Sequence, residues 1–403
     1  MDKHADYVII GSGVAGYHAL TELLSKKVIM ITSDQDFPYD RPPLSKEYLR
    51  GEVEKPFFNP PEFYAEHKVE IMLNTEVERI DNTSKEVVLK GGRSVSFDKA
   101  LIATGGRPRK LNVSGEELPG VKYLRSLRDC DSIKESIAKG VKRPVIVGGG
   151  FIGIEVASSL VKLGLRPTII EALPHIWTSF VREDISKHVM SYLQSRGIEI
   201  ITGEGVKEIV GRSKVEGVVT QGGKRVDGDL VLVAVGILPN VEVAQRSGIA
   251  VENGILADEH LRTSFKDVYV AGDVANVMDP ITKKRRRIEH WNNAQYTGVI
   301  AAKNMMGGEE KYDFLSTVWS DIFDLHIESA GETREYEDYV LRGNVDSNSF
   351  VSIYLKGGEV CGYVAFNRDE RELSTLNNLI VKRVPVSNLK EKLKDQSFDL
   401  SST

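Results

Sequence analysis

Apolar runs that end at glycine turns mark the first strands of the chain. The run YVIIG begins at Tyr7, leads through a glycine-rich turn into a segment with helical apolar spacing, and is followed by a second run, VIMI, at residues 28–31. Strands that alternate with amphipathic helices are typical of a parallel sheet covered by helices. The pattern therefore predicts a strand–helix–strand unit. The apolar positions of its helix include Val14, Leu20, Leu23 and Leu24.

The same pattern recurs in the middle of the chain. The segment PVIVGGGFIGIEVASSLVKLGLRPTIIE again joins a strand, a glycine turn, a helix and a strand. Each unit is followed at a similar distance by an apolar strand that closes on glycine: Gly105 lies 94 residues after Gly11, and Gly236 lies 88 residues after Gly148. Such internal repetition predicts an α/β chain with two Rossmann-like domains.

The carboxyl-terminal region has a different pattern. The segment SFVSIYLKGGEVCGYVAFN predicts a hairpin that turns at Gly357 and Gly358, and RELSTLNNLI has the apolar spacing of a helix. We therefore expect residues 316–403 to form a small α+β interface domain. The apolar face of its helix would be Leu373, Leu376, Leu379 and Ile380.

The glycines of both turns have the spacing of a dinucleotide-binding motif. The first glycine permits a tight turn, the second lets the backbone approach a pyrophosphate, and the third lets helix and strand pack closely. A plain strand-to-helix turn is the alternative, but the flanking strands and helices favour dinucleotide binding. The motif residues are Gly11, Gly13 and Gly16 in the first unit and Gly148, Gly150 and Gly153 in the second.

An acidic residue after each turn can identify the ribose that is bound. Glu171 stands 23 residues after Gly148, at the end of a predicted strand, where its carboxylate could bind both ribose hydroxyls and repel a 2′-phosphate. This position predicts NADH rather than NADPH for the second unit; an exposed strand-end glutamate is the alternative. In the first unit either Ser33 or Asp34 could meet the ribose.

Composition narrows the class of protein. With 403 residues, of which 41% are hydrophobic, the chain can form two or three domains, and a net charge of −5 gives it no general attraction for nucleic acid or membranes. No apolar run approaches the roughly 20 residues of a membrane span, and a strand that begins at Tyr7 leaves no room for a secretory signal. Cys130 and Cys361 form no metal-binding or redox pair motif, although a long-range disulfide stays open. We expect a cytoplasmic protein without a metal site.

One further carboxylate points to the first ligand. In LRTSFKDVYVAGDVAN, a short strand delivers Asp273 immediately after Gly272. There its carboxylate could bind a polyhydroxyl chain such as the ribityl group of a flavin.

Taken in order, these motifs resemble a known family. GSGVAG, ATGG, GGGFIG, VGILPN and TSFKDVYVAGD are similar to the motifs of glutathione-reductase-like flavoproteins, which bind FAD and NAD(P)H in separate domains. PYDRPPLSK, EHWNNAQ and WSD resemble the NADH-dependent ferredoxin reductases, the group of putidaredoxin reductase and biphenyl dioxygenase reductase, which is also related to apoptosis-inducing factor. The resemblance covers the whole chain. The chain departs from it at Ser33, where an acid is usual, and before Trp319, where LSTV replaces proline and aromatic residues.

The resemblance implies a domain plan. Residues 1–113 and 243–315 would form a discontinuous FAD domain around an NADH domain of residues 114–242, since Asp273 returns to the flavin after the second unit is complete. The domain of residues 316–403 would cover the flavin or form a homodimer.

The resemblance also implies site residues. Lys46 and Glu155, the latter on the first turn of its helix, would form an ion pair beside the flavin; a surface lysine and a helix-terminal carboxylate are the alternatives. Arg41 would bind the FAD pyrophosphate or be a solvated loop residue, and Trp291 would pack near the isoalloxazine or in a core. The remaining cofactor-binding candidates are Val14, Ala15, Val77, Ala103, Thr104, Gly105, Arg107, Phe151, Ile152, Gly236 and Gly272.

The lack of a cysteine in one segment indicates the kind of electron acceptor. Ser45 occupies the region where disulfide reductases carry a reactive cysteine, so a dithiol relay is excluded. A one-electron acceptor such as a 2Fe–2S ferredoxin or a rubredoxin is expected. An NADH oxidase that uses O2 and a redox-dependent binding protein like apoptosis-inducing factor are the alternatives.

A basic run could dock that acceptor. KKRRR follows Pro280, which suggests that it begins in a loop, and it is either a solvated loop or strand edge or a patch that steers an acidic ferredoxin. Its residues are Lys283, Lys284, Arg285, Arg286 and Arg287.

Overall fold

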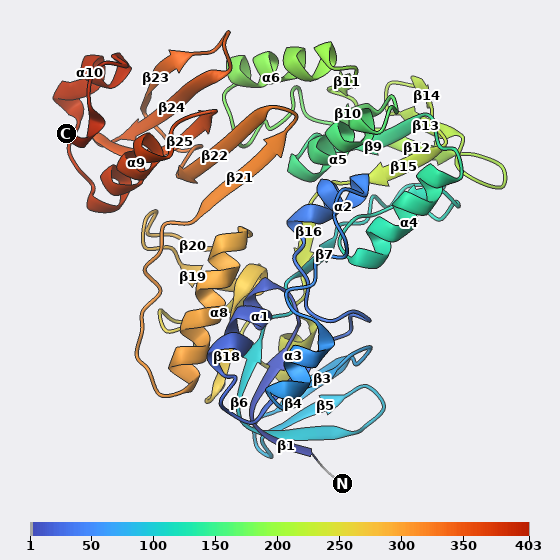
Figure 1. Ribbon diagram of the computed structural model, residues 1–403, viewed down its shortest axis with the longest axis vertical. Helices are drawn as coiled ribbons and strands as arrows, with labels where there is room; N and C mark the ends of the chain where they lie inside the picture. Colours follow the sequence, from blue (N-terminus) through green and yellow to red (C-terminus); the bar gives the residue numbers. More distant parts are fainter. Residues whose placement is uncertain (1–2, 403) are drawn as a thin grey trace. The chain divides into compact units, whose positions relative to one another are not determined.

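The computed structural model describes residues 3–402, which form two compact units (Figure 1). Unit 1 contains the chain up to Asp40, then Pro56–Arg107 and Leu238–Val318, and unit 2 contains Arg41–Lys55, Pro108–Ile237 and the chain from Trp319 onward. The predicted FAD, NADH and C-terminal domain boundaries stay a prediction. In the compact units Arg41–Lys55 clusters with unit 2, and unit 2 also contains residues from both the predicted NADH domain and the predicted C-terminal domain.

Unit 1 is built on a sheet with the strand order β3-β2-β1-β6-β5-β4, in which β18 also pairs with β6. Helices α1 and α8 pack together so closely that a Cβ on Gly298 would lie 2.2 Å from the carbonyl oxygen of Ala15. The elements are β1 (Lys3–Ile10), α1 (Val14–Glu22), β2 (Val28–Ile31), α3 (Pro61–Glu66), β3 (Glu70–Met72), β4 (Val77–Asp81), β5 (Glu86–Leu89), β6 (Ser94–Ile102), α7 (Glu242–Ser247), β17 (Ile255–Leu256), β18 (Val268–Val270), η2 (Gly272–Val274), β19 (Ala275–Met278), β20 (Arg285–Arg287) and α8 (Trp291–Met305). Strands β7 (Gly106–Pro108), β16 (Ile237–Pro239) and β21 (Thr317–Ile322) run across the unit boundaries along the chain.

Unit 2 begins with a second sheet of order β11-β10-β9-β15-β8 and a three-stranded sheet of β12, β13 and β14. The pairings of β9 with β10 and β15 are parallel, as the strand–helix–strand pattern predicts. The elements are η1 (Pro42–Ser45), α2 (Glu47–Arg50), β8 (Val121–Lys122), α4 (Leu127–Ala138), β9 (Pro144–Val147), α5 (Phe151–Lys162), β10 (Thr168–Glu171), α6 (Glu183–Ser195), β11 (Glu199–Thr202), β12 (Val206–Val210), β13 (Gly217–Thr220), β14 (Arg225–Asp227) and β15 (Leu230–Val233).

The rest of unit 2 is a sheet of order β21-β22-β25-β24-β23, drawn in orange and red in Figure 1, with α9 packed on β25. The hairpin that turns at Gly357 and Gly358, both with positive φ, is confirmed, and all four apolar residues predicted on the α9 face are buried. The elements are β21 (Thr317–Ile322), β22 (Leu325–Gly331), β23 (Asp338–Asn344), β24 (Ser349–Lys356), β25 (Glu359–Phe366), α9 (Glu370–Lys382), η3 (Ser387–Leu389), α10 (Lys390–Lys394) and η4 (Leu400–Ser402).

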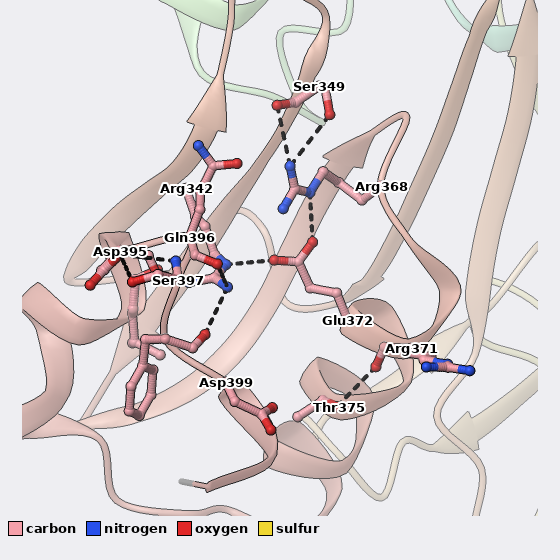
Figure 2. Close-up of polar contacts among 12 residues, drawn as sticks. Arg342, Ser349, Arg368, Arg371, Glu372, Thr375, Asp395, Gln396, Ser397 and Asp399 are labelled. Atoms are coloured by element: carbon pink, nitrogen blue, oxygen red, sulfur yellow. Dashed lines mark hydrogen bonds and ion pairs between the residues drawn. The ribbon is translucent and has the colours of Figure 1, made fainter.

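A buried arginine ties the end of the chain to this sheet (Figure 2). Arg342 on β23 is 5% exposed, and its Nε donates to Glu372 of α9 at 2.5 Å. The other oxygen of Glu372 accepts from Arg368 at 2.6 Å, so one carboxylate joins two guanidinium groups. The remaining Arg342 nitrogens donate to the carbonyl oxygens of Leu393, Asp395, Gln396 and Phe398.

Both cysteines are free, so the open alternative of a long-range disulfide is wrong. Burial raises the pKa of Cys130 to about 12 and that of Cys361 to about 11, which keeps both thiols protonated at neutral pH. Within residues 3–402 there is no helix with the length and apolar character that crossing a membrane requires.

Candidate functional site

The glycine turn after β1 lies at the carboxyl edge of the unit 1 sheet. Gly11 has a φ of +112°, and a Cβ on it would lie 2.2 Å from the carbonyl oxygen of Ala103, the residue that follows β6. A Cβ on Gly16 would lie 2.1 Å from the carbonyl oxygen of Gly11. These contacts leave no room for a side chain, which is the close packing of helix and strand that the first and third glycines predict.

The turn after β9 repeats this geometry in unit 2. A Cβ on Gly148 would lie 2.3 Å from the carbonyl oxygen of Ala234, and one on Gly153 would lie 2.1 Å from that of Gly148. The middle glycine differs, because a Cβ on Gly150 would meet nothing within 4 Å. Gly150 therefore opens a space in front of the backbone, as close approach of a pyrophosphate requires.

Both helices that follow these turns begin with a glycine N-cap, Gly13 for α1 and Gly150 for α5. In the described chain no side chain caps either helix, and neither has an acidic residue in its first turn. The amide groups of each first turn, with Val14 and Ala15 in α1 and Phe151 and Ile152 in α5, are therefore available to an anion. The two sites fit the pyrophosphates of FAD and NADH.

Glu171 is held against the glycine turn of unit 2. One carboxylate oxygen accepts from the backbone N–H of Gly149 at 2.7 Å, and the other accepts from that of Leu173 at 2.8 Å. The side chain is thus oriented at the end of β10 rather than free in solvent, which favours the ribose-binding interpretation over a solvated strand-end glutamate.

The two ribose candidates of unit 1 differ in their surroundings. Asp34 accepts from the Tyr39 hydroxyl at 2.8 Å and from the backbone N–H of Asp36 at 3.3 Å, whereas Ser33 is exposed. Asp34 therefore has a fixed orientation, and both residues stay predicted ribose contacts.

Asp273 reaches the same sheet edge as the first glycine turn. Strand β18 pairs in parallel with β6, with Val270 opposite Ile102, so Gly272 and Asp273 follow at the edge where Ala103 lies. Gly272 has a φ of +76° and donates to the Thr297 hydroxyl at 3.0 Å. This arrangement brings the predicted flavin residues of two distant segments together in unit 1.

The other candidates of unit 1 have structural partners. Thr104 exchanges hydrogen bonds of 2.7 and 2.8 Å with Asn240, whose backbone N–H donates to the carbonyl oxygen of Gly105. Arg107 is paired with Glu242 at 2.7 Å, and Val77 is buried in the core at the start of β4. The geometry gives these residues a clear structural role and leaves their cofactor contacts as predictions.

Trp291, the first residue of α8, is fixed by the loop that precedes Arg41. Its indole Nε1 donates to Asp40 at 2.7 Å, and its ring meets the edge of His18 with centroids 5.8 Å apart. The indole is therefore oriented by a polar contact, which a plain core tryptophan does not require.

Lys46 and Glu155 form a buried ion pair in unit 2. The Nζ of Lys46 lies 3.0 Å from Oε1 of Glu155, with side-chain exposures of 11% and 6%. The hydroxyl of Ser45 donates to Oε2 at 2.5 Å, and that of Ser320 donates to Oε1 at 2.6 Å. Glu155 is the fifth residue of α5, so the expectation that it lies on the first turn is wrong. Neither a surface lysine nor a helix-terminal carboxylate describes this pair.

The segment that carries Lys46 is attached to unit 2 at several points. Arg41 donates to the carbonyl oxygen of Arg125 at 2.7 Å, and the Tyr48 hydroxyl donates to Asp131 at 2.5 Å. Arg41 is therefore bound to the protein, unlike a solvated loop arginine. Its bond to the FAD pyrophosphate stays a prediction.

The basic run is not a uniform loop. Its arginines form β20, whose register places Arg287 opposite Asn276, while Lys283 and Lys284 are exposed. Mutual repulsion within the run is offset by these partners: Arg285 donates to the carbonyl oxygens of Ala257 and Asn276, Arg286 pairs with Asp279, and Arg287 binds Glu289 and the carbonyl oxygen of Asp273.

The sequence does not predict four residues that contact candidate site residues: Asp40 and Asn240 in unit 1, and Ser45, as a partner of Glu155, and Ser320 in unit 2. Asp40 and Ser45 lie within the quoted PYDRPPLSK motif, and Ser320 lies within WSD. The motifs indicate that these residues belong to functional segments of the chain. They contain no information about which side chain each residue contacts.

Comparisons with known proteins agree with this geometry. The ferredoxin–NAD(+) reductase subunit of the benzene 1,2-dioxygenase system of Pseudomonas putida is 32% identical over 97% of this chain and 96% of its own. Rubredoxin–NAD(+) reductase of Ectopseudomonas oleovorans is 33% identical over 91% of this chain and 96% of its own. The crystal structure of the covalent putidaredoxin reductase–putidaredoxin complex matches with a TM-score of 0.93 and 28% identity, over 100% of this chain and 98% of that chain.

Family models cover almost all of the chain. The pyridine nucleotide-disulphide oxidoreductase model matches residues 5–298, and the reductase C-terminal model matches residues 317–403. These matches confirm the predicted fold, with two Rossmann-like domains and a C-terminal domain, and the resemblance to ferredoxin reductases. The chain therefore belongs to the pyridine nucleotide-disulphide oxidoreductase family of FAD- and NAD(P)H-dependent enzymes.

Proposed function

We propose that this protein is an FAD-dependent reductase that takes a hydride from NADH and passes single electrons to an acidic ferredoxin or a rubredoxin. The observation that carries the proposal is the buried Lys46–Glu155 pair, in which a hydroxyl, that of Ser45, stands where a reactive thiol would be needed for disulfide chemistry. Cys130 donates to the carbonyl oxygen of Leu44 nearby, but it is a single, protonated thiol and cannot provide a dithiol relay.

Each set of residues has a defined part in this reaction. When bound, FAD accepts a hydride from NADH and can release its electrons singly. The α1 turn with Asp273 would hold FAD, and the α5 turn with Glu171 would hold NADH. Lys46 and Glu155 would position and polarise the reacting groups, and Trp291 would flank the flavin ring.

The remaining features of the proposal are the segments that bind each cofactor and the cellular compartment. We propose that residues 1–113 and 243–315 bind FAD and that residues 114–242 bind NADH, and the glycine turns in those segments support this assignment. A reducing cytoplasmic setting is in keeping with two free thiols.

The proposed function is tested by steady-state NADH oxidation with a ferredoxin, a rubredoxin, a quinone and coenzyme A disulfide, each assayed anaerobically and in air. Rapid turnover with O2 alone would favour an NADH oxidase instead.

Asp273→Ala is expected to weaken FAD retention. The ribityl hydroxyls would lose the carboxylate to which they donate, and hydrogen bonds to a charged group contribute about 1.5–3 kcal/mol, so we expect a dissociation constant roughly 10- to 100-fold higher. The protein-bound flavin absorbance after gel filtration measures this loss. Asp98→Ala, which changes an exposed aspartate of the same unit, is the control; equal flavin content in both variants would contradict the role of Asp273.

Glu171→Ala is expected to reduce the preference for NADH. Like-charge repulsion of a 2′-phosphate is worth several kcal/mol, so the intact protein should prefer NADH by roughly 100-fold and the variant by about 10-fold or less. The ratio of kcat/KM values for NADH and NADPH measures the preference. Glu199→Ala, at an exposed position on the neighbouring strand β11, should leave the ratio unchanged; an unchanged ratio in Glu171→Ala itself would show that this carboxylate does not bind the ribose.

The docking interpretation of the basic run is tested at its two exposed lysines. Reversing the three arginines would break their bonds within unit 1 and disturb the fold, whereas Lys283→Glu/Lys284→Glu reverses charges at exposed positions. This double variant should raise the KM for an acidic ferredoxin about 10-fold at low salt and flatten its salt dependence, with ferricyanide reduction unaltered. Lys26→Glu/Lys27→Glu, another exposed lysine pair of unit 1, is the control. Equal effects of the two double variants would show that the run is not the docking site.

A further inference from the structure

Ser320 lies on the buried side of strand β21 and binds Glu155. Side chains along this strand alternate, so that Trp319 is 37% exposed whereas Ser320 is 0% exposed. The hydroxyl of Ser320 donates to Oε1 of Glu155 at 2.6 Å. A residue of the C-terminal sheet thus contacts a helix of the second glycine-turn unit, and both belong to unit 2.

The Glu155 carboxylate is held from three directions. Ser320 and Lys46 both meet Oε1, and Ser45 meets Oε2. Bonds to an ionised acceptor are shorter and stronger than neutral ones, so the two hydroxyls, one on each oxygen, fix the plane of the carboxylate while Lys46 supplies its counter-charge. Without a hydroxyl on Oε1, Lys46 would be the single donor to that oxygen among the described residues.

The position of Ser320 is itself fixed. At the turn between β21 and β22, the backbone N–H of Phe323 donates to the hydroxyl of Ser158 on α5 at 3.3 Å. On the other side of the carboxylate, the hydroxyl of Ser159 donates to the carbonyl oxygen of Ser45 at 2.7 Å. Both hydroxyl donors to Glu155 therefore come from segments that α5 holds through neighbouring serines.

We propose that Ser320 is a positioning residue that orients Glu155 toward Lys46 for the reduction of the flavin by NADH. This inference rests on the proposed function of the Lys46–Glu155 pair. Ser320 acts through Glu155, so the C-terminal sheet supplies a component of the site that the second glycine-turn unit lacks by itself.

The kinetic test is a mutant cycle on the FAD-loaded protein. Ser320→Ala should slow flavin reduction by NADH about 10-fold in stopped flow, which is the loss expected for one hydrogen bond to a charged group. Ser329→Ala, which removes a buried hydroxyl from the neighbouring strand β22, should leave the rate within twofold of the unmodified protein. In a Glu155→Gln background, Ser320→Ala should cause no further loss, because its effect passes through the carboxylate.

The second readout does not depend on activity. The carboxylate stretching band of Glu155 is isolated as the infrared difference between the unmodified protein and Glu155→Gln. The band should shift in Ser320→Ala, stay in place in Ser329→Ala and return in Ser320→Thr, which keeps the hydroxyl.

Three results would overturn the proposal. If Ser320→Ala reduces the flavin as fast as Ser329→Ala while Glu155→Gln is slow, Ser320 has no positioning role although the function proposed for Glu155 stands. If Glu155→Gln is also as fast as the unmodified protein, the assignment of the ion pair fails and the role of Ser320 fails with it. An unshifted infrared band in Ser320→Ala would show that the hydrogen bond does not hold the carboxylate.

Discussion

Lys46→Met is expected to lower the free energy of unfolding by about 3–5 kcal/mol, because it leaves the buried Glu155 carboxylate without its counter-charge. Ser45 and Ser320 would still donate to the carboxylate, but hydroxyl groups do not supply the missing positive charge. Urea denaturation of the FAD-loaded protein, followed by circular dichroism, measures the change. Lys162→Met, at an exposed position on α5, the helix that carries Glu155, is the matched control and should have little effect.

The double variant Lys46→Met/Glu155→Gln separates the charge from the packing. Removing both charges takes away the desolvation penalty along with the attraction, so the double variant should recover most of the stability lost in Lys46→Met. If the two substitutions were additive instead, the contact between the two side chains would contribute nothing to folding.

The same variants should reduce catalysis for a different reason. If Lys46 positions the reacting groups, its loss should slow flavin reduction by about 100-fold, the size of effect that a misplacement of about 1 Å produces. The double variant should then stay slow although its stability returns. A double variant that recovered both stability and rate would leave the pair with a structural role alone.

The parts of the fold that the sequence predicts are those with local causes. The spacing of Gly11, Gly13 and Gly16 determines a turn within a few residues, and the paired glycines at 357 and 358 determine a hairpin in the same way. Repetition of the first pattern at Gly148 then predicts a second domain of the same kind. Buried strands and amphipathic helices follow from periodicity over about ten residues, without any information from distant segments.

Contacts between distant segments are harder to predict from the sequence. The motif order places Ser45 and Ser320 near a flavin enzyme's site, but their convergence on Glu155 depends on how η1, α5 and β21 pack. The assignment of Arg41–Lys55 to unit 2 likewise depends on how η1 and α2 pack against α4 and α5. No local pattern specifies such partners.

The pairing of charges in the basic run is equally hard to predict from the sequence. Consecutive positive residues suggest a solvated patch, but strand alternation and nearby carbonyl groups give each arginine a partner. Whether a charge is paired depends on residues such as Asp279 and Glu289, whose positions relative to the run are set by the turn and by β20. Composition alone therefore does not show which charges of the run are paired within the protein.

Arg342→Met is expected to release the end of the chain from the C-terminal sheet. The guanidinium is buried, and its loss would leave carbonyl oxygens between Leu393 and Phe398 without their donor (Figure 2). Glu372 would keep Arg368 as a partner, so no uncompensated carboxylate would remain. We expect a loss of about 3 kcal/mol, since each buried acceptor that loses its donor costs about 1–3 kcal/mol and the released segment can recover part of that by meeting water.

The matched variant Arg368→Met tests whether the effect belongs to Arg342. Arg368 binds the same carboxylate but otherwise donates hydrogen bonds only to Ser349 among the described residues, so its loss should cost about 1–2 kcal/mol and leave the chain end in place. Amide hydrogen exchange distinguishes the two variants, because Arg342→Met should speed exchange across residues 390–402 and Arg368→Met should not. Arg342→Lys should fall between them, since an ammonium can reach one or two acceptors but cannot reproduce the planar fork that reaches Glu372 and the carbonyl oxygens together.

Unchanged exchange in Arg342→Met would show that the apolar contacts of Leu393 and Leu400 are sufficient to hold the end of the chain on the sheet.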